Sequence, residues 1–220
     1  MALEIMDVLD AVKGRRSVTF FEADRTIPDG TLQELLELAN LAPSSFNLQP
    51  WQVVVVRDPE RKKILRRYAL DQSKIEEASA VLIVVADPDV KVNLDSMLDS
   101  WEELGYIKKA SRATITHMVR TRYGPEGSFE RKIFAAKNAA LFAMSLMLAA
   151  RGLGLETHAI DGFDERPMKK AFAIPDDKLV PMLIAIGYLR SNAVLLPRAF
   201  RRPFEDFVHF EVYGADQAPG

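Results

Sequence analysis

Apolar residues recur at every third or fourth position in several stretches of the chain, which is the pattern of an amphipathic helix. In residues 29–41 these positions include Leu32 and Leu35, and Pro43 follows the predicted end of the helix. Pro59 marks the start of a short charged helix, because proline suits the first helical turn. The pattern predicts helices over residues 3–13, 29–41, a short segment from residue 59, about 129–152 and 164–173.

Short runs of aliphatic and β-branched residues predict strands. Residues 80–86 (AVLIVVA) are apolar throughout, as expected for a strand that is buried on both faces. Strands are predicted over residues 51–57, 80–86, 155–160 and 180–189, with a further short strand at 207–212. Helices and strands alternate without the regular rhythm of a doubly wound fold, so the predicted fold class is α+β.

Residues 133–150 form the most apolar stretch, which is rich in alanine and interrupted by Lys137, Asn138 and Ser145. The stretch falls short of the roughly 20 apolar residues that a membrane span requires. We therefore expect a buried central helix, whose alanines let another helix approach closely, including one from a second subunit. The acidic, amphipathic N-terminal sequence lacks the features of a signal peptide, which predicts a cytoplasmic protein with no membrane partner.

The composition is that of a globular protein, and we expect a single domain over residues 1–220. The chain carries 29 basic and 31 acidic residues, and a net charge of −2 argues against binding to nucleic acid. Cysteine is absent, which excludes thiol catalysis, disulfides and iron–sulfur clusters. Three histidines, none at helical spacing from another, are too few to predict a metal site.

Two glycine- or serine-containing segments each allow a plain structural interpretation. Gly152 and Gly154 follow a helix and precede a strand, so they suit a helix C-terminus better than a dinucleotide-binding loop. Ser44 and Ser45 lie in the loop PSSFNLQP, which is dense in hydrogen-bonding groups and has a proline at each end. Such a loop either satisfies its own polar groups or binds a flat, polar ligand.

Two basic segments lie far apart in the sequence. Residues 15–17 (RRS) follow the first helix, and Arg198, Arg201 and Arg202 lie in the irregular tail. Arginine forks suit bidentate binding of phosphate, although solvated surface clusters have the same composition. Lys74 precedes an apolar strand and is either a surface residue or a cation that stabilises a bound anion.

Taken in order, these segments resemble the nitroreductase family of FMN-dependent oxidoreductases. The matching segments are residues 15–17 (RRS), 43–51 (PSSFNLQPW), 152–157 (GLGLET), 160–164 (IDGFD), 186–188 (IGY) and 201–205 (RRPFE). Each segment alone is common, but the ordered set over nearly the whole chain is specific. Residues 89–130 match little and are expected to form a variable segment that faces the substrate.

The resemblance implies an α+β fold with a mixed or antiparallel sheet flanked by helices. It also implies an interlocked homodimer with two shared FMN sites at its interface. By position, Arg15, Ser17 and Arg201 are expected to bind the phosphate and ribityl chain, with Arg16 near the ring. Lys74 is expected near N1 and the C2 carbonyl of the flavin.

Other residues are expected around the flavin ring. Asp71 and Gln72 occupy positions where relatives place an amide against the ring edge, and Asp71 stands where some relatives carry asparagine. Ile160, Asp161 and Gly162 are expected over or beside the ring near N5. The residues expected from the partner subunit are Pro43, Ser44, Ser45 and Asn47.

The implied activity is transfer of hydride from NAD(P)H through flavin N5 to a nitroaromatic, a quinone or a similar small acceptor, in ping-pong order. No side chain is needed as a catalytic group, because the flavin carries the redox chemistry. Two alternatives stay open: a non-catalytic flavin-binding sensor or storage protein, and a relative that dehalogenates aromatics or fragments flavin. Phe46 either stacks on aromatic substrates or packs in the core.

Overall fold

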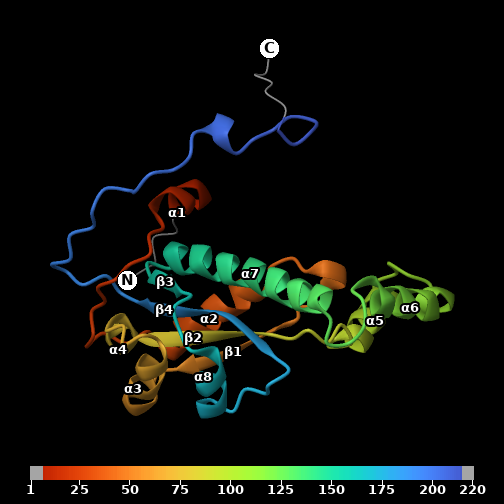
Figure 1. Ribbon diagram of the computed structural model, residues 1–220, viewed down its shortest axis with the longest axis horizontal. Coiled ribbons are helices and arrows are strands. Elements are labelled where there is room, and N and C mark those ends of the chain that lie inside the picture. The colour runs from red at the N-terminus through yellow and green to blue at the C-terminus, as the bar shows by residue number, and fades with distance from the viewer. Residues whose placement is uncertain (1–6, 215–220) are drawn as a thin grey trace.

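In residues 7–214, the part of the chain that the computed structural model describes, four strands form one antiparallel sheet (Figure 1). The strand order is β1 (Trp51–Val56), β2 (Ala80–Ala86), β4 (Leu179–Gly187) and β3 (Glu156–Ile160). Each neighbouring pair of strands is antiparallel. The predicted α+β class, with an antiparallel sheet flanked by helices, is confirmed.

Helices cover both faces of the sheet, and the side-chain alternation of β2 explains why. Leu82 and Val84 belong to one buried cluster and Val81 and Ile83 to another, because successive side chains in a strand point to opposite faces. Figure 1 shows α7 and α2 on one face and α3, α4 and α8 on the other. The helices are α1 (Val8–Gly14), α2 (Asp29–Asn40), α3 (Pro59–Tyr68), α4 (Lys74–Glu77), α5 (Leu94–Glu103), α6 (Arg112–Arg122), α7 (Phe129–Gly152) and α8 (Glu165–Ala171).

The central helix α7 is the main element of the helical layer on one face of the sheet. It packs against α1, α2 and all four strands of the sheet. Ser128 caps its N-terminus by accepting a hydrogen bond from Arg131 N, and the left-handed Gly154 (φ 73°) follows its C-terminus. By length and composition α7 could cross a membrane, but half of its most apolar window is buried within the protein. The prediction of a buried central helix is confirmed.

Most predicted boundaries lie within a few residues of those observed. The first helix, predicted over residues 3–13, appears as α1, and residues 1–6 lie outside the described part of the chain. Residues 89–130 contain α5 and α6, which are joined by the short 3₁₀ helix η2 (Lys109–Ser111). α3 begins at Pro59 as predicted, and Asp58 caps it, because its side chain accepts a hydrogen bond from Arg61 N.

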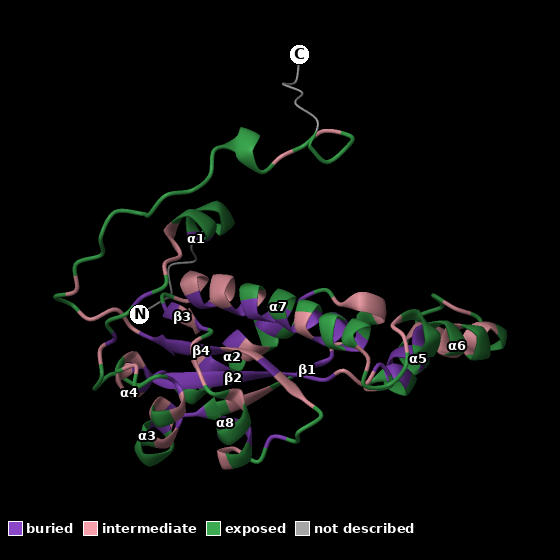
Figure 2. Cartoon of the chain, viewed as in Figure 1, coloured by how far each residue is buried: buried purple, intermediate pink, exposed green. Residues whose placement is uncertain are grey.

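The strand predicted at residues 207–212 is wrong. This segment forms turns and bends after the short 3₁₀ helix η3 (Phe204–Asp206). A strand requires a neighbouring strand to satisfy its backbone groups, and residues 7–214 of this chain place none beside the tail. Figure 2 shows the tail as largely exposed, whereas the central strands of the sheet are buried.

Leu35 and Leu38 offer a matched test of the core on α2. Leu35 is fully buried, whereas Leu38 is 42% exposed. We expect Leu35→Ala to lower the free energy of unfolding by about 2–5 kcal/mol, because it removes buried methyl groups and leaves a cavity. Leu38→Ala should cost less than half as much. Urea denaturation at one fixed protein concentration measures both, and equal losses would contradict this packing.

Candidate functional site

The segment after α1 lies along the free edge of β3. Ser17 forms a parallel bridge with Thr157, and Val18 N donates a hydrogen bond to Thr157 O at 3.0 Å. β3 is an edge strand, so its outer backbone groups are free to accept this segment. The arrangement fixes residues 15–17 beside the start of β3.

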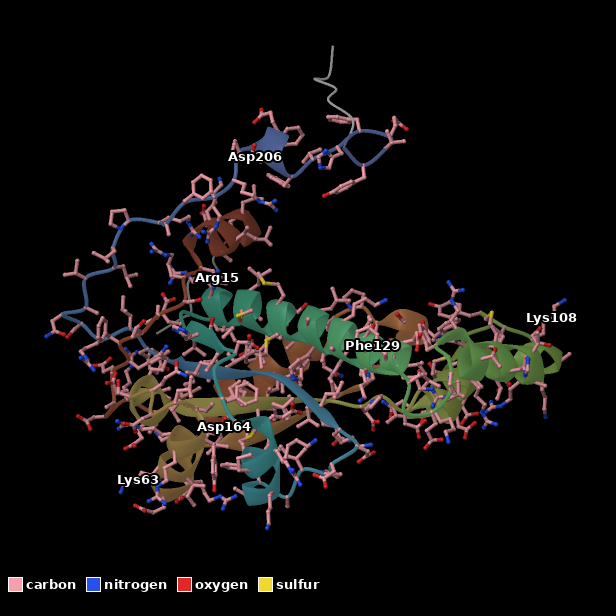
Figure 3. All side chains as sticks on the ribbon, in the orientation of Figure 1. Arg15, Lys63, Lys108, Phe129, Asp164 and Asp206 are labelled. Carbon is pink, nitrogen blue, oxygen red and sulfur yellow. The ribbon has the colours of Figure 1, made fainter. Side chains whose placement is uncertain are left out.

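Arginines from the two ends of the chain converge at this place. Arg198 Nη2 donates to the carbonyl oxygens of Lys13 and of Arg15, the latter at 3.2 Å. Arg16 Nη2 donates to Leu196 O at 2.9 Å. These bonds hold the tail against the end of α1. Arg15 lies beside the C-terminal end of α7, and Phe129 marks the other end of that helix (Figure 3). The predicted residues Arg15, Arg16, Ser17 and Arg201 are therefore near one another.

The four arginines Arg15, Arg16, Arg198 and Arg201 (the arginine cluster) carry unbalanced positive charge. Burial lowers the pKa of Arg15, and the charges of Arg198, Arg201 and Arg16 lower it further, while Glu156 opposes them. Arginine does not lose its proton in proteins, so these effects express desolvation of Arg15 and repulsion by its neighbours rather than loss of its charge. No carboxylate of residues 7–214 lies within 4.0 Å of the cluster's nitrogens.

Glu156 is the nearest candidate counter-ion, but its carboxylate is already engaged. It forms an ion pair with Arg151, whose guanidinium comes from the last turn of α7. Burial raises the pKa of Glu156, and the charges of Arg151 and Arg15 oppose that increase. The arginine cluster therefore retains an excess of positive charge that suits an anionic ligand such as a phosphate.

The side chain of Lys74, from α4, contacts that of His158, from β3. Lys74 Nζ lies 3.1 Å from His158 Nε2, and His158 Nδ1 lies 2.9 Å from Val18 O. A carbonyl oxygen can only accept, so Nδ1 carries the proton and Nε2 accepts from the Lys74 ammonium. Burial lowers the pKa of Lys74. Burial also lowers the pKa of His158, to which Lys74 adds, while the bond to Val18 O opposes the decrease.

Gln72 and Gly162 connect the α3–α4 loop to the end of β3. Gln72 Nε2 donates to Gly162 O at 3.1 Å and to Ala69 O at 2.9 Å. A Cβ atom at Gly162 would lie 3.0 Å from the Leu70 side chain, so this approach favours glycine. The carboxylate of Asp71 pairs with Arg66 Nε at 2.8 Å and is exposed, which directs it toward α3.

The loop that contains Pro43, Ser44, Ser45 and Asn47 is held by α7. Ser45 N donates to Asn138 Oδ1 at 2.9 Å, and Asn138 Nδ2 donates to Phe134 O at 2.7 Å. Phe46 and Asn47 adopt left-handed φ angles of 54° and 53°. Such angles in non-glycine residues cost on the order of 1–3 kcal/mol each and cluster at functional sites.

This loop lies away from the other predicted site residues. It contacts α7 at Asn138, whereas the arginine cluster lies beside Arg151 and Glu156. Between Asn138 and Arg151 the helix rises about 20 Å. One chain therefore gathers residues 15–17, Arg201, Lys74, Gln72 and Gly162 around β3, and it holds the loop of residues 43–47 elsewhere.

The family of the chain follows from comparison with known sequences. A model described as "Nitroreductase family" matches residues 12–188. This chain belongs to the nitroreductase family. The resemblance based on its ordered motifs is thereby confirmed.

Several relatives match most of the length of this nitroreductase. A protein of Thermus thermophilus named NADH dehydrogenase is 34% identical over 187 residues, which are 84% of this chain and 88% of that protein. MhqN of Bacillus subtilis, a candidate NAD(P)H nitroreductase, is 33% identical over 199 residues, which are 90% of this chain and 96% of that protein. The structure of a candidate nitroreductase in complex with FMN from Exiguobacterium sibiricum has a TM-score of 0.82, with 29% identity and coverage of 94% of this chain and 98% of that one.

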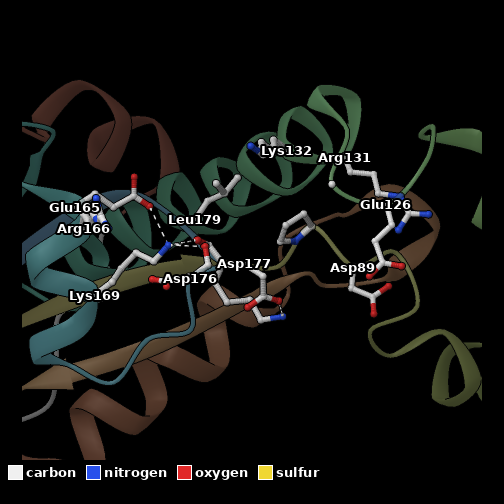
Figure 4. A pocket seen from close by; sticks show the side chains of 13 residues that line it. Asp89, Glu126, Arg131, Lys132, Glu165, Arg166, Lys169, Asp176, Asp177 and Leu179 are labelled. Atoms are coloured by element: carbon white, nitrogen blue, oxygen red, sulfur yellow. Dashed lines mark hydrogen bonds and ion pairs between the residues drawn. The ribbon is translucent and has the colours of Figure 1, made fainter.

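A separate cavity of about 690 Å³ lies between α7 and the region around α8 (Figure 4). Two of its lysines are engaged by neighbouring groups. Lys169 Nζ donates to the carbonyl oxygens of Asp176 and Lys178, and Lys178 Nζ pairs with the buried Asp87 at 2.9 Å. None of the predicted cofactor residues of this nitroreductase is among those that line the cavity.

Three residues of the site are absent from the sequence-based prediction. Arg198 is noted there as basic but is not assigned to the ligand. His158 has no motif around it, although it lies two residues after Glu156 and therefore on the same face of β3. Asn138 breaks an otherwise apolar helix, and that interruption is the signal of a buried polar contact.

Arg201 and Arg202 provide a test of the arginine cluster. Arg201 interacts electrostatically with Arg15, whereas Arg202 Nη1 donates to Asp206 O in the tail. A hydrogen bond to a charged group contributes about 1.5–3 kcal/mol, so Arg201→Ala should weaken binding of inorganic phosphate roughly tenfold or more. Arg202→Ala should have little effect. Thermal-shift titration with phosphate at constant ionic strength measures both, and equal losses would refute the assignment.

Proposed function

We propose that this chain is an FMN-dependent NAD(P)H oxidoreductase that reduces nitroaromatics, quinones or similar small acceptors. The observation that carries the proposal is the arginine cluster, which forms no ion pair with a carboxylate of residues 7–214, together with the half-buried Lys74 beside the same strand, β3. A strand rises about 3.3 Å per residue, so the arginine cluster at the start of β3 and the Lys74 ammonium near its middle are spaced to contact two parts of one elongated ligand. Membership of the nitroreductase family supports the same conclusion.

The residues at the start of β3 fit the phosphate end of FMN. Arg15, Arg198 and Arg201 supply guanidinium groups, and Ser17 supplies an exposed hydroxyl. Guanidinium forks bind phosphate oxygens in pairs, and a phosphate dianion relieves the repulsion among the arginines. Arg16, whose guanidinium donates to Leu196 O, would contribute near the ring.

The residues near the middle and end of β3 fit the flavin ring. Bound FMN would supply an N5 atom that accepts and returns hydride, so that reductant and acceptor use one site in turn. The ammonium group of Lys74 would lie beside the part of the ring that gains negative charge on reduction, and it would stabilise that charge in a partly dry site. Ile160, Asp161 and Gly162 would lie along the ring near N5. Gln72 would orient this segment through its bond to Gly162 O.

A homodimer with shared sites would complete the arrangement. The loop of residues 43–47 lies away from the arginine cluster of its own chain, so it would reach the flavin of a partner subunit. Apolar side chains on three segments are exposed and suit burial in such an interface. They include Val8, Leu9 and Val12 on α1, Ile133, Leu141 and Met144 on α7, and Leu196, Phe200 and Phe204 in the tail.

Residues 89–130 would face the substrate. Figure 1 shows α5 and α6 at the end of the molecule away from α1, and Figure 3 places Lys108 at the far tip. Tyr123 of this segment packs edge-on against Phe46, with ring centroids 6.5 Å apart. The contact couples the segment to the loop that would cover the partner's flavin. It favours a packing role for Phe46. The cytoplasm is the compartment proposed for this enzyme.

Absorbance and stopped-flow measurements test the function. The purified protein should be yellow, because oxidised flavin has an absorption band at about 450 nm. Anaerobic mixing with NADH or NADPH should bleach this band, and a quinone or nitroaromatic should restore it. Absence of flavin would overturn the proposal. Bound flavin that NAD(P)H does not reduce would favour a sensor or storage protein, and turnover only with a halogenated aromatic would favour a dehalogenase.

Mixed dimers test whether two chains share each site. Arg15→Glu in one chain and Asn47→Asp in the other should each impair both sites of a homodimer. In the mixed dimer, one site receives both substitutions and the other receives none, so FMN occupancy and activity should recover to about half of the wild-type values. Co-expression with two different tags and purification of the doubly tagged species provides the sample.

The oligomeric state of each sample must be measured alongside its activity. A mixed dimer that stays dimeric but is no more active than the two homodimers would place the whole flavin site within one chain. That result would refute the shared site without affecting the proposed cofactor.

A further inference from the structure

Lys74 has a flexible side chain, and one side-chain contact fixes its direction in the described structure. The residue opens α4, a helix of four residues, next to the end of the sheet where β3 lies (Figure 1). No carboxylate of residues 7–214 lies within 4.0 Å of its ammonium group. The one side-chain partner that the structure gives it is His158 Nε2, at 3.1 Å.

The imidazole of His158 is itself held in place. Its Nδ1 donates to Val18 O at 2.9 Å, and Val18 N donates to Thr157 O at 3.0 Å. The same edge contact that positions residues 15–17 therefore fixes the imidazole ring and its tautomer. Nε2 is left as an acceptor that faces Lys74.

We infer that His158 is a positioning residue for the flavin chemistry: as a neutral acceptor, it orients the Lys74 ammonium and thereby favours reduced over oxidised FMN in this site. The inference rests on the proposed function, because it requires FMN beside Lys74. His158 itself does not touch the reacting atoms. It occupies one of the three N–H donors of Lys74 and directs the remaining two toward the ligand.

The charges around His158 are consistent with a neutral imidazole. Lys74 faces it from α4, and Arg15 and Glu156 lie toward the start of β3. The carboxylate of Glu156 is engaged by Arg151, and that of Glu77 on α4 by Arg190 and by Phe21 N. A protonated imidazole would therefore face a cation 3.1 Å away with no free carboxylate of residues 7–214 to balance it.

Asparagine and glutamine separate the two hydrogen bonds of His158. The asparagine amide reaches the position of Nδ1, so His158→Asn can keep the bond to Val18 O but lacks an acceptor for Lys74. The glutamine amide reaches the position of Nε2, so His158→Gln keeps that acceptor. A purely structural role would not distinguish these two variants in the order expected here.

The midpoint potential of bound FMN is the decisive measurement. Reduction by dithionite with reference dyes gives it without NAD(P)H. We expect His158→Asn to weaken reduced relative to oxidised FMN roughly tenfold, which for a two-electron couple is a shift of about 30 mV to more negative potential. His158→Gln should stay close to the wild type. Equal shifts in both variants, or no shift in His158→Asn, would overturn the inference.

A double-mutant cycle assigns the effect to Lys74. In a Lys74→Met background, His158→Asn should cause no further shift, because the coupling between the two residues is already lost. A full additional shift would show that His158 acts by another route and would refute the inference. NMR of the protein without flavin gives an independent readout. The imidazole should carry its proton on Nδ1, and Lys74→Met should raise the pKa of His158, because Lys74 lowers it.

Failure of this inference can be told apart from failure of the proposed function. Wild-type protein that binds FMN but is not reduced by NAD(P)H would overturn the proposed function alone, since the potentials are measured without NAD(P)H. Wild-type protein that binds no FMN would overturn both. Normal turnover with His158→Asn and His158→Gln at equal potentials would overturn the role of His158 alone.

Discussion

The constraint on which the site depends is positive charge that no carboxylate of residues 7–214 balances in an ion pair. Four guanidinium groups gather beside the start of β3, where Arg15 is partly buried and is repelled by the charges of the other three. The fold holds them there with backbone bonds: Arg198 donates to Arg15 O, Arg16 donates to Leu196 O, and Val18 N donates to Thr157 O. An anion bound at this place would offset the repulsion on Arg15.

The edge strand β3 orders the chemistry along its length. Its start lies beside the arginine cluster, its middle residue His158 meets Lys74, and its end leads into Gly162, which Gln72 contacts. Each of these partners comes from a different part of the chain. A small shift of β3 against β4 would therefore disturb the phosphate end and the ring end together. β3 carries the polar side chains Glu156 and His158 on one face, although its neighbour β4, and β2 beyond it, are largely apolar.

The sequence predicts the fold better than it predicts the contacts of the site. β2 is predicted to the residue, because an unbroken apolar run between polar segments has one plain interpretation. The strand at 207–212 is wrong, because the pattern of apolar residues does not show whether a partner strand is present. The convergence of Arg15 with Arg201 follows from family resemblance and not from local pattern, since 185 residues separate them. His158 is missed because a single histidine on a strand has the same pattern whether it packs, binds or orients a lysine.

The strained loop of residues 43–47 and the exposed apolar tail are both unfavourable in a single chain, and a homodimer would account for both. The loop of residues 43–47 stores backbone strain at Phe46 and Asn47, yet it lies about 20 Å along α7 from the arginine cluster. The tail exposes Phe200 and Phe204, and no strand of residues 7–214 lies beside it. A second copy related by two-fold symmetry would bring the strained loop to the flavin and cover the apolar tail in one interface. The same association that completes the site would then cover the exposed tail, and binding of the flavin would offset the strain in the loop.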